Sequence, residues 1–267
     1  EIVVRQKRHY PEGTLMSHIL GYVAEANEEE LEKNQALSLG DSVGKQGLEL
    51  TMENWLRGAK GRKQVEVDAL GRQHNEKVLT EPNAGNNIGL SIDLDLQRLA
   101  AGLLEGQAGA IVVLDPDTGK LLALVSQPAY DNNLFVLGVP QDKWAELRDD
   151  PMHPIQNRTT QGLYPPGSVF KLLVAAAGLS EGFTTYNDGV VCTGSYQLGN
   201  RKFHCWKKGG HGYVDLRRAL VQSCDVYFYK LGERMGMDRL NAYAKASGFG
   251  VPTDRKSTRL NSSHRIR

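Results

Sequence analysis

Residue types that could carry out acyl transfer lie in residues 164–171, Tyr-Pro-Pro-Gly-Ser-Val-Phe-Lys, which run directly into apolar residues 172–177. Residues three apart are neighbours on a helix face, so we expect the Ser168 hydroxyl and the Lys171 amine to come within hydrogen-bond distance. Burial disfavours a charged lysine, and a neutral amine can accept the proton of an attacking serine. The spacing therefore predicts a serine nucleophile with a lysine base.

The flanking residues predict how this pair is positioned. Pro165 and Pro166 suit a chain that enters a helix, and Gly167 allows a sharp turn, so we expect the helix to begin at or near Ser168. Residues 169–179 are apolar on nearly every side except at Lys171, a pattern typical of a helix packed inside a domain. A lysine in such a helix needs a chemical role.

Two further short patterns bear on this interpretation. A second Ser-x-x-Lys, from Ser42 to Lys45, lies between glycines with no apolar helix behind it, so it predicts a loop with a solvated lysine. Ser223 and Asp225 lie between two helix-like runs and offer another hydroxyl and a polar acceptor. We expect Ser223 and Asp225 to join Ser168 in one site.

Together these residues resemble the penicillin-binding proteins, relatives of the serine β-lactamases that share the motifs S-x-x-K, S-D-N and K-T-G. The approach 157–162 resembles the family's lead-in to the nucleophile, and residues 110–126 resemble the strand pair that opens its transpeptidase domain. Residues 206–212, with Asp225 closing the second motif, are similar to the class B, penicillin-binding protein 2 subclass of cell elongation. Residues 9–14 and 19–23 share that similarity.

The resemblance implies an α+β fold. We expect a β-lactamase/transpeptidase-like domain at residues 86–254, an antiparallel sheet flanked by helices with its C-terminal part missing. A small mixed α/β pedestal, or dimerisation, domain at residues 1–85 precedes it. Residues 81–89 are rich in Asn, Gly and Pro and mark the predicted boundary.

The C-terminal residues depart from the family pattern. The sequence contains no Lys-Thr-Gly, and Lys256-Ser257-Thr258 is not a substitute, so the chain is predicted to stop before the third motif. Residues 255–267 are polar and basic without an apolar period, and we interpret them as a non-native tail of cloning or adaptor origin. The alternative is a genuine basic tail.

Composition narrows the possible partners and the compartment. Hydrophobic residues make up 40% and charged residues 24% of a chain with a formal net charge of +1, which gives no reason to expect nucleic acid as a partner. The sequence has no run of eighteen apolar residues and begins at Glu1. The resemblance implies an N-terminal membrane anchor outside this sequence and a place on the periplasmic face of the inner membrane.

Several local elements are predicted from periodicity and punctuation. Asp93 can cap a helix over 94–105 whose apolar stripe is Leu96, Leu99, Ala100, Leu103 and Leu104. Residues 115–119 connect two apolar runs as an antiparallel hairpin. The other expected elements are helices over 28–33 and 45–55, a half-buried strand over 65–72 that turns at Gly71, a crossing loop over 131–150, a short helix with Leu216, Ala219 and Leu220, and a helix with Tyr227, Leu231 and Met235 along one stripe.

All three cysteines, Cys192, Cys205 and Cys224, fall in one segment together with His204 and His211. In an oxidising compartment two of them would form a disulfide and leave one thiol. The alternative is a tetrahedral zinc site of three thiolates and an imidazole. The spacing matches no compact zinc finger and by itself favours a disulfide or free thiols.

The resemblance reverses that preference. Some members of the subclass carry a structural zinc between the first two motifs, with one ligand inside the second motif, where Cys224 stands. This implies a zinc site of Cys192, Cys205, His211 and Cys224, with His211 a better ligand than His204. Such a site would clamp residues 192–211 against Ser223.

The resemblance also implies a reaction and its partners. Ser168 would attack the D-alanyl-D-alanine bond of a peptidoglycan stem peptide with Lys171 as base, Ser223 as proton relay and Asp225 fixing their surroundings. β-Lactams would acylate the same serine, and a SEDS-type glycosyltransferase and other elongation-complex proteins would be partners. The alternatives are a non-catalytic module that binds those partners, and a β-lactamase or β-lactam sensor.

Overall fold

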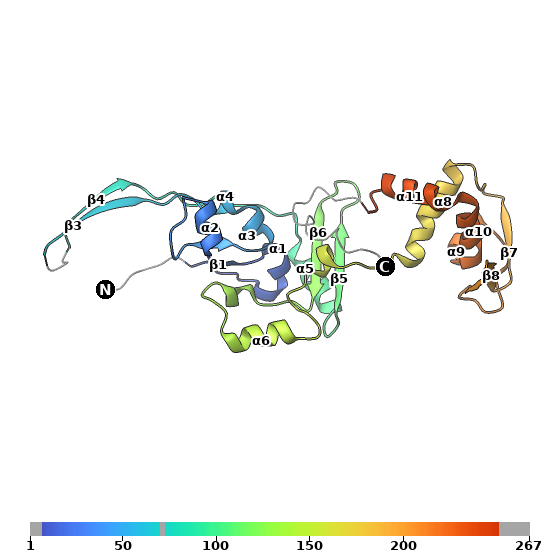
Figure 1. Cartoon of the computed structure of the whole chain (residues 1–267), viewed down its shortest axis with the longest axis horizontal. Coiled ribbons are helices and arrows are strands. Elements are labelled where there is room, and N and C mark those ends of the chain that lie inside the picture. Colours follow the sequence, from blue (N-terminus) through green and yellow to red (C-terminus); the bar gives the residue numbers. More distant parts are fainter. Residues whose placement is uncertain (1–6, 70–72, 251–267) are drawn as a thin grey trace. The chain divides into compact units, whose positions relative to one another are not determined.

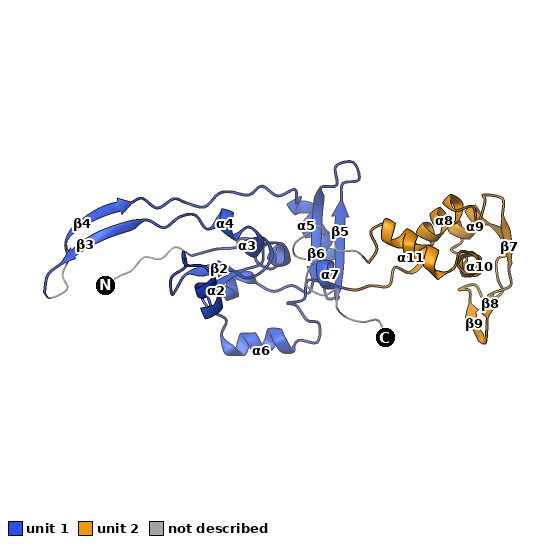
Figure 2. Ribbon diagram, turned by 45° about the horizontal axis from the view of Figure 1, so that its top comes forward, with its two compact units in different colours: residues 1–162, 256–267 blue, residues 163–255 orange. Residues whose placement is uncertain are grey.

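The computed structural model describes residues 7–69 and 73–250, and it divides into two compact units. Of the described residues, those up to 162 form the first unit and those from 163 to 250 form the second (Figure 2). The division into units at residue 162 does not test the predicted domain boundary at residues 81–89, because elements after that loop also pack against residues near the start of the chain. The Gln97 amide, for example, donates hydrogen bonds to the carbonyls of Leu15 and Leu124.

The first unit begins with short helices and strands and ends with a longer hairpin and two helices (Figure 1). Its elements are η1 (Gly13–Leu15), α1 (Ser17–Leu20), β1 (Val23–Glu25), α2 (Glu28–Lys33), β2 (Ser42–Gly44), α3 (Gly47–Thr51), α4 (Glu53–Leu56), β3 (Arg62–Val67), β4 (Gln73–Thr80), α5 (Leu94–Leu103), β5 (Gly109–Leu114), β6 (Leu121–Gln127), η2 (Asn132–Phe135), α6 (Gln141–Asp149) and α7 (Arg158–Gln161).

The second unit is a cluster of helices beside two strand pairs (Figure 1). Its elements are η3 (Gly167–Val169), α8 (Phe170–Ser180), β7 (Gly189–Cys192), β8 (Ser195–Leu198), β9 (Arg201–His204), β10 (Gly212–Asp215), α9 (Leu216–Val221), α10 (Asp225–Met235) and α11 (Met237–Ala246).

Every sheet among the described residues is an antiparallel pair of strands: β1–β2, β3–β4, β5–β6, β7–β10 and β8–β9. The predicted hairpin is confirmed, since β5 pairs with β6 from Gly109 opposite Gln127 to Leu114 opposite Leu121. The predicted cap is confirmed too, because the Asp93 side chain accepts hydrogen bonds from the N–H groups of Asp95 and Leu96. Helices combined with antiparallel strands give the α+β class.

Three local predictions for the first unit were wrong in part. The helix expected over 45–55 is broken at Met52 into α3 and α4. The strand β3 pairs only with β4 among the described residues, and Val67 is 60% exposed in this two-stranded ribbon. The crossing loop over 131–150 contains η2 and α6. The turn predicted at Gly71 lies outside the described residues.

The core of the second unit explains why α10 holds its place. Tyr227, Leu231 and Met235 share one stripe of α10 and are at most 3% exposed, as the sequence predicted. They pack with Val174 of α8 and Leu216 of α9, so both helices that flank the second motif are fixed in one core. Burying such side chains stabilises a fold by roughly 1.5–3 kcal/mol each.

Helix α8 is not buried on all sides, contrary to expectation. Val174, Ala175 and Ala177 are buried, whereas Val169, in the turn before the helix, and Leu172 are 72% and 61% exposed. Within the described residues α8 packs against α9, α10 and α11, and part of its surface stays exposed. Its apolar composition does not by itself show that every side is covered.

A search of the described residues finds no helix that is both long enough and apolar enough to cross a membrane.

Candidate active site

Ser168 lies in the short 3-10 turn η3 that leads into α8. Gly167, just before it, has φ +57°, a left-handed conformation that glycine adopts without steric cost. The α-helix proper begins at Phe170, so the prediction that the helix starts at or near Ser168 is confirmed. Ser168 is exposed at the N-terminal end of the helix, where a substrate can reach it.

Lys171 lies in the first turn of α8 and its side chain is only 14% exposed. The amine donates to three oxygens: Asp225 Oδ1 at 2.5 Å, the Ser223 carbonyl at 2.9 Å and Ser223 Oγ at 2.9 Å. Three oxygens surround the amine, which explains how a nearly buried lysine is accommodated. The amine is thereby held in one position.

Ser223 connects the lysine to the candidate nucleophile. Its hydroxyl lies 2.9 Å from Ser168 Oγ and 2.9 Å from Lys171 Nζ. Its backbone φ is +50°, a conformation that side chains rarely adopt and that costs of order 1–3 kcal/mol. Ser223 keeps this strained conformation between α9 and α10, which indicates that its hydroxyl group is needed at this position.

The structure changes one detail of the predicted pair. Among the described residues the Lys171 amine forms no direct hydrogen bond with the Ser168 hydroxyl, because Asp225 and Ser223 engage the amine instead. The connection runs from Lys171 through the Ser223 hydroxyl to Ser168. The three residues and Asp225 are therefore brought together as expected, but with Ser223 in the middle.

Asp225 begins α10 and contacts two different elements. One carboxylate oxygen faces Lys171, and the other accepts a hydrogen bond from the Trp206 backbone N–H at 3.0 Å. The Trp206 indole N–H donates to the carbonyl of Gln222 at 3.0 Å. The sequence assigned Trp206 no part in the site, and only its place beside Cys205 could have suggested one.

The cysteines and His211 form a second cluster behind the site. One donor atom from each of Cys192, Cys205, His211 and Cys224 lies within 4.8 Å of the others, and all three cysteines are buried as free thiols. His211 Nδ1 faces the thiols, 3.7 Å from Cys192 Sγ and 3.5 Å from Cys205 Sγ. His204 is exposed outside the cluster.

Electrostatics in this cluster suit a metal. Burial lowers the pKa of the His211 imidazole, favouring the neutral ring that a metal binds, and burial raises the pKa of the Cys224 thiol to about 12. The raised pKa of the Cys224 thiol means that a metal ion would have to displace its proton, so the case for a metal rests on the four converging donors. The donor set of three sulfurs and one nitrogen therefore fits a structural zinc ion.

The second Ser-x-x-Lys is not a site, although its structure differs from the expected loop. Ser42 begins strand β2, and Lys45 forms an ion pair with Glu30 at 2.5 Å with 19% of its side chain exposed. The lysine is paired and not solvated, because the β1–β2 pair and α2 place a carboxylate beside it. No helix presents Ser42 and Lys45 on one face.

A serine just before helix α8, a lysine three residues further on and a Ser-x-Asp between two helices match the arrangement expected of a serine acyltransferase site. Comparison with known families agrees. A family model described as "Penicillin binding protein transpeptidase domain" matches residues 109–264, and one described as "Penicillin-binding Protein dimerisation domain" matches residues 1–90. The chain belongs to the penicillin-binding protein transpeptidase family.

The curated relatives show which members of this family the chain is similar to. The chain is 40% identical over 256 residues to "Peptidoglycan D,D-transpeptidase MrdA" of Acinetobacter baumannii, covering 94% of this chain and 38% of that protein. The protein of the same name from Escherichia coli is 39% identical over 258 residues, covering 94% and 41% respectively. The chain thus spans about two fifths of the length of these relatives.

Solved structures agree with the curated relatives. Pseudomonas aeruginosa PBP2 in complex with WCK 5153 matches with a TM-score of 0.80 and 41% identity, covering 91% of this chain and 51% of that one. Helicobacter pylori PBP2 in complex with MreC matches with a TM-score of 0.83 and 39% identity, covering 92% and 46%. The predicted resemblance to penicillin-binding protein 2 is confirmed.

Proposed function

We propose that this chain carries the acyl-transfer residues of a peptidoglycan D,D-transpeptidase of cell elongation, a target of β-lactams. The observation that carries the proposal is the connected set Ser168, Ser223, Lys171 and Asp225, held by hydrogen bonds of 2.5–2.9 Å. Family membership and the printed names of the relatives support it.

Formation of the acyl-enzyme follows from the order of these contacts. The Ser168 oxygen attacks the carbonyl between the two D-alanines, and its proton passes through the Ser223 hydroxyl to a neutral Lys171 amine. The backbone N–H of Ser168 helps to stabilise the developing oxyanion. The peptide C–N bond breaks, D-alanine leaves after its nitrogen takes a proton back through the same relay, and an ester remains on Ser168.

The second half-reaction reverses these roles. An amine of a neighbouring stem peptide attacks the ester and gives up a proton through Ser223 to Lys171. The ester C–O bond breaks, and Ser168 Oγ regains a proton as the new peptide bond forms. Asp225 keeps Lys171 beside Ser223 throughout, because it contacts the amine at 2.5 Å.

A zinc ion, if bound, would be held by Cys192, Cys205, His211 and Cys224. It would supply a structural cross-link and no chemistry at the substrate. Its effect would reach the site through the chain neighbours of its ligands, since Cys205 precedes Trp206 and Cys224 lies between Ser223 and Asp225. Trp206 contacts Asp225, and Ser223 contacts Ser168.

The location and partners belong to the same proposal. We place the protein at the periplasmic face of the inner membrane, where its substrate is found, working with elongation-complex proteins such as a SEDS-type glycosyltransferase. In support, one structural relative is described in complex with MreC and another is described as part of a peptidoglycan synthase complex.

The proposal is tested by the release of D-alanine from a stem pentapeptide, with and without an acceptor amine. We expect release by the unaltered protein, loss in Ser168→Ala, and no change in the control Ser42→Ala, which alters the other Ser-x-x-Lys. Release that survives Ser168→Ala would contradict the assignment. A folded protein without release would support the non-catalytic module instead, and rapid hydrolysis of penicillin would support a β-lactamase.

A further inference from the structure

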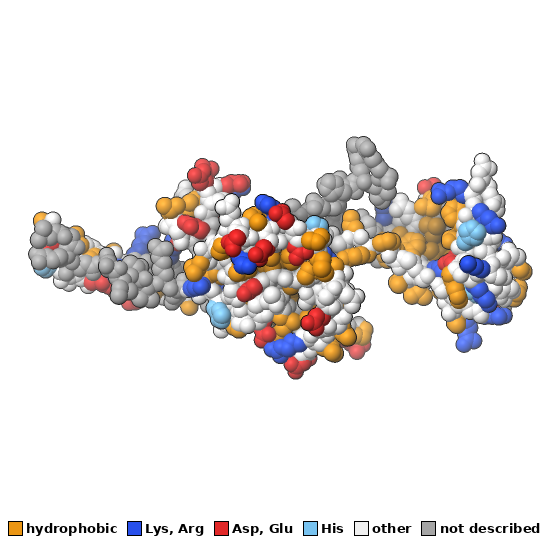
Figure 3. All heavy atoms as spheres, turned by 90° about the horizontal axis from the view of Figure 1, so that it is seen from below, with side chains coloured by type: hydrophobic (Ala, Val, Ile, Leu, Met, Phe, Trp, Pro, Cys, Tyr) orange, Lys and Arg blue, Asp and Glu red, His pale blue; other side chains and the backbone are white. Residues whose placement is uncertain are grey.

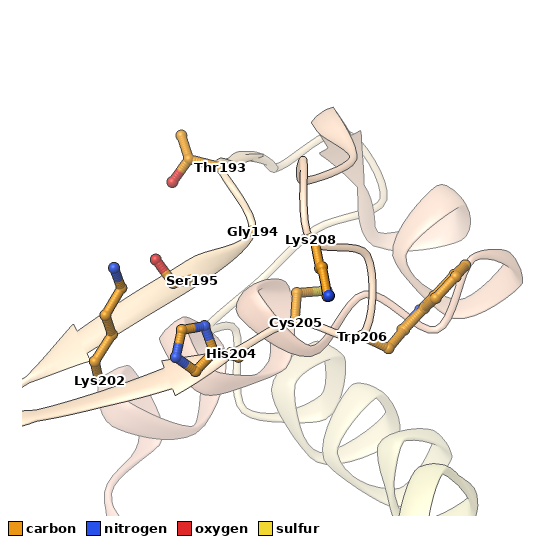
Figure 4. Close-up of a pocket in the computed structure, with 8 residues that line it drawn as sticks. All are labelled: Thr193, Gly194, Ser195, Lys202, His204, Cys205, Trp206 and Lys208. Atoms are coloured by element: carbon orange, nitrogen blue, oxygen red, sulfur yellow. The ribbon is translucent and has the colours of Figure 1, made fainter.

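A cavity of about 510 Å³ lies beside the candidate active site in the second unit. Two sides are formed by the β8–β9 hairpin and by the loop after it, as Figure 4 shows. Its volume is within the range of small-ligand sites. Eight residues line it: Thr193, Gly194, Ser195, Lys202, His204, Cys205, Trp206 and Lys208.

The lining residues are cationic or hydroxyl-bearing, and no carboxylate is among them. Residues 193–212 contain four Lys or Arg and no Asp or Glu. Within the described part of the second unit, Lys171 has Asp225 as an ion-pair partner, whereas Lys202 and Lys208 have no carboxylate partner. In Figure 3 basic side chains, drawn in blue, gather over this unit around a histidine. The cavity therefore combines unpaired positive charge with hydroxyl groups.

The hairpin presents these groups because its two faces differ. Lys202 and His204 are two residues apart on β9 and so share a face, and Ser195 lies opposite His204 in the strand register. The intervening Phe203 is half-buried and packs on Tyr229 of α10 with ring centroids 5.6 Å apart. The apolar face thus anchors the hairpin, and the polar face is left for the cavity.

The floor of the cavity is built by close backbone packing. Gly194 has φ +92°, and a Cβ there would lie 2.2 Å from the carbonyl oxygen of Lys208. The Cys205 N–H also donates to the Gly194 carbonyl at 2.9 Å. Only glycine at this position allows the loop that carries Lys208 to approach the hairpin so closely. The close packing at Gly194 therefore determines where Lys208 lies relative to the hairpin that carries Lys202.

We infer that this cavity binds a carboxylate of an acidic peptidoglycan stem peptide, next to the site of acyl transfer. Lys202, His204 and Lys208 would receive the carboxylate, and Ser195 and Thr193 would donate hydrogen bonds. Trp206, 64% exposed, offers an apolar ring to the body of the peptide or its sugar. Its backbone touches Asp225, so a ligand here lies beside the reacting residues. This inference rests on the proposed function.

Binding of a soluble muramyl peptide with a free D-glutamate carboxylate, followed by titration calorimetry, tests it. We expect affinity to fall as salt rises and to be at least about fivefold weaker for Lys202→Gln/Lys208→Gln. Lys202→Arg/Lys208→Arg should restore it. The control Lys230→Gln/Lys245→Gln removes the same charge from the same unit outside the cavity and should bind like the unaltered protein.

Three outcomes would overturn the inference: equal affinity of the Gln double variant and the unaltered protein, equal affinity for a peptide with that carboxylate amidated, or tighter binding of inorganic phosphate or anionic vesicles than of the peptide.

Penicillin acylation of the same samples separates this inference from the proposed function. The control Lys230→Gln/Lys245→Gln should be acylated at the normal rate. An unaltered protein that binds the peptide but is not acylated would overturn the proposed function and leave the cavity assignment standing.

Discussion

At the scale of single residues, the site depends on a serine that bridges two others. Ser223 contacts both Ser168 and Lys171, and the lysine has no direct bond to the nucleophile among the described residues. Sequence spacing predicted the members of this set, but it could not predict their order. That order depends on the left-handed φ of Ser223 and on where α10 places Asp225, which are properties of the fold.

Removing the Ser223 hydroxyl should separate activity from stability. Ser223→Ala should lower the rate of penicillin acylation by about 10²–10⁴-fold, because proton transfer to Lys171 loses its bridge. Ser223→Gly should lower it as much while the melting temperature stays level or rises, since glycine accepts φ +50° without strain. Acylation kinetics and thermal melting measure the two effects. Unchanged acylation in both variants would rule out the relay, and Ser180→Ala in α8 serves as the control.

A second residue-scale prediction concerns pH. Burial, with a contribution from the charge of Arg158, lowers the pKa of His18 from 6.5 to about 4. The unfolded chain therefore binds a proton that the folded chain does not between these values. Stability is full above about pH 6.5 and falls as the pH drops toward 4, by at most roughly 3 kcal/mol from this group.

The substitution His18→Phe isolates this term, because it keeps a ring against Tyr130, 5.2 Å away, and removes the titrating group. Denaturant unfolding at several pH values should show a shallower loss of stability on acidification for the variant. Parallel curves for the two proteins would show that His18 is not protonated on unfolding in this range.

At the scale of elements, the strands and loops around the cysteines position the second motif. Cys192 ends β7, Cys205 follows β9, His211 precedes β10 and Cys224 caps α10, so four elements converge on one cluster. Spacing alone could not distinguish a metal site from a disulfide, because it does not show which chain segments meet. The strand pairings β7–β10 and β8–β9 supply that information.

Removal of metal should therefore loosen the site. We expect about one zinc per chain by elemental analysis, and a chelator or Cys205→Ser should lower the melting temperature by at least about 5 °C and slow acylation. Protein without zinc whose melting temperature is insensitive to chelation would refute the zinc proposal. Thiol titration would then show whether Cys192, Cys205 and Cys224 are free or form a disulfide.

The sequence predicted the buried stripe of α10 correctly and that of α5 only in part. The stripe of α10 is buried as expected because three helices meet there. In α5 the expected stripe included Leu99, which is 61% exposed, while Gln97 is 1% exposed and bonds to the backbone of Leu124. A polar side chain that satisfies buried strand groups can take a core position that hydrophobic periodicity assigns to leucine.

At the scale of the whole molecule, the motifs predicted the family, but the sequence could not show which distant segments pack together. The family models match residues 1–90 and 109–264, whereas the compact units divide at residue 162. Contacts such as that of Gln97 with Leu15 join segments far apart in the sequence, and composition cannot show them. The predicted boundary at 85 and the interpretation of residues 255–267 stay predictions.

The central claim is that Ser168 is the acylated nucleophile of this chain. The most direct measurement is intact mass after incubation with benzylpenicillin, followed by peptide mapping of the adduct. We expect one penicilloyl group per chain, located at Ser168 and absent in Ser168→Ala. An adduct at another residue, or a folded chain that gains no mass, would contradict it.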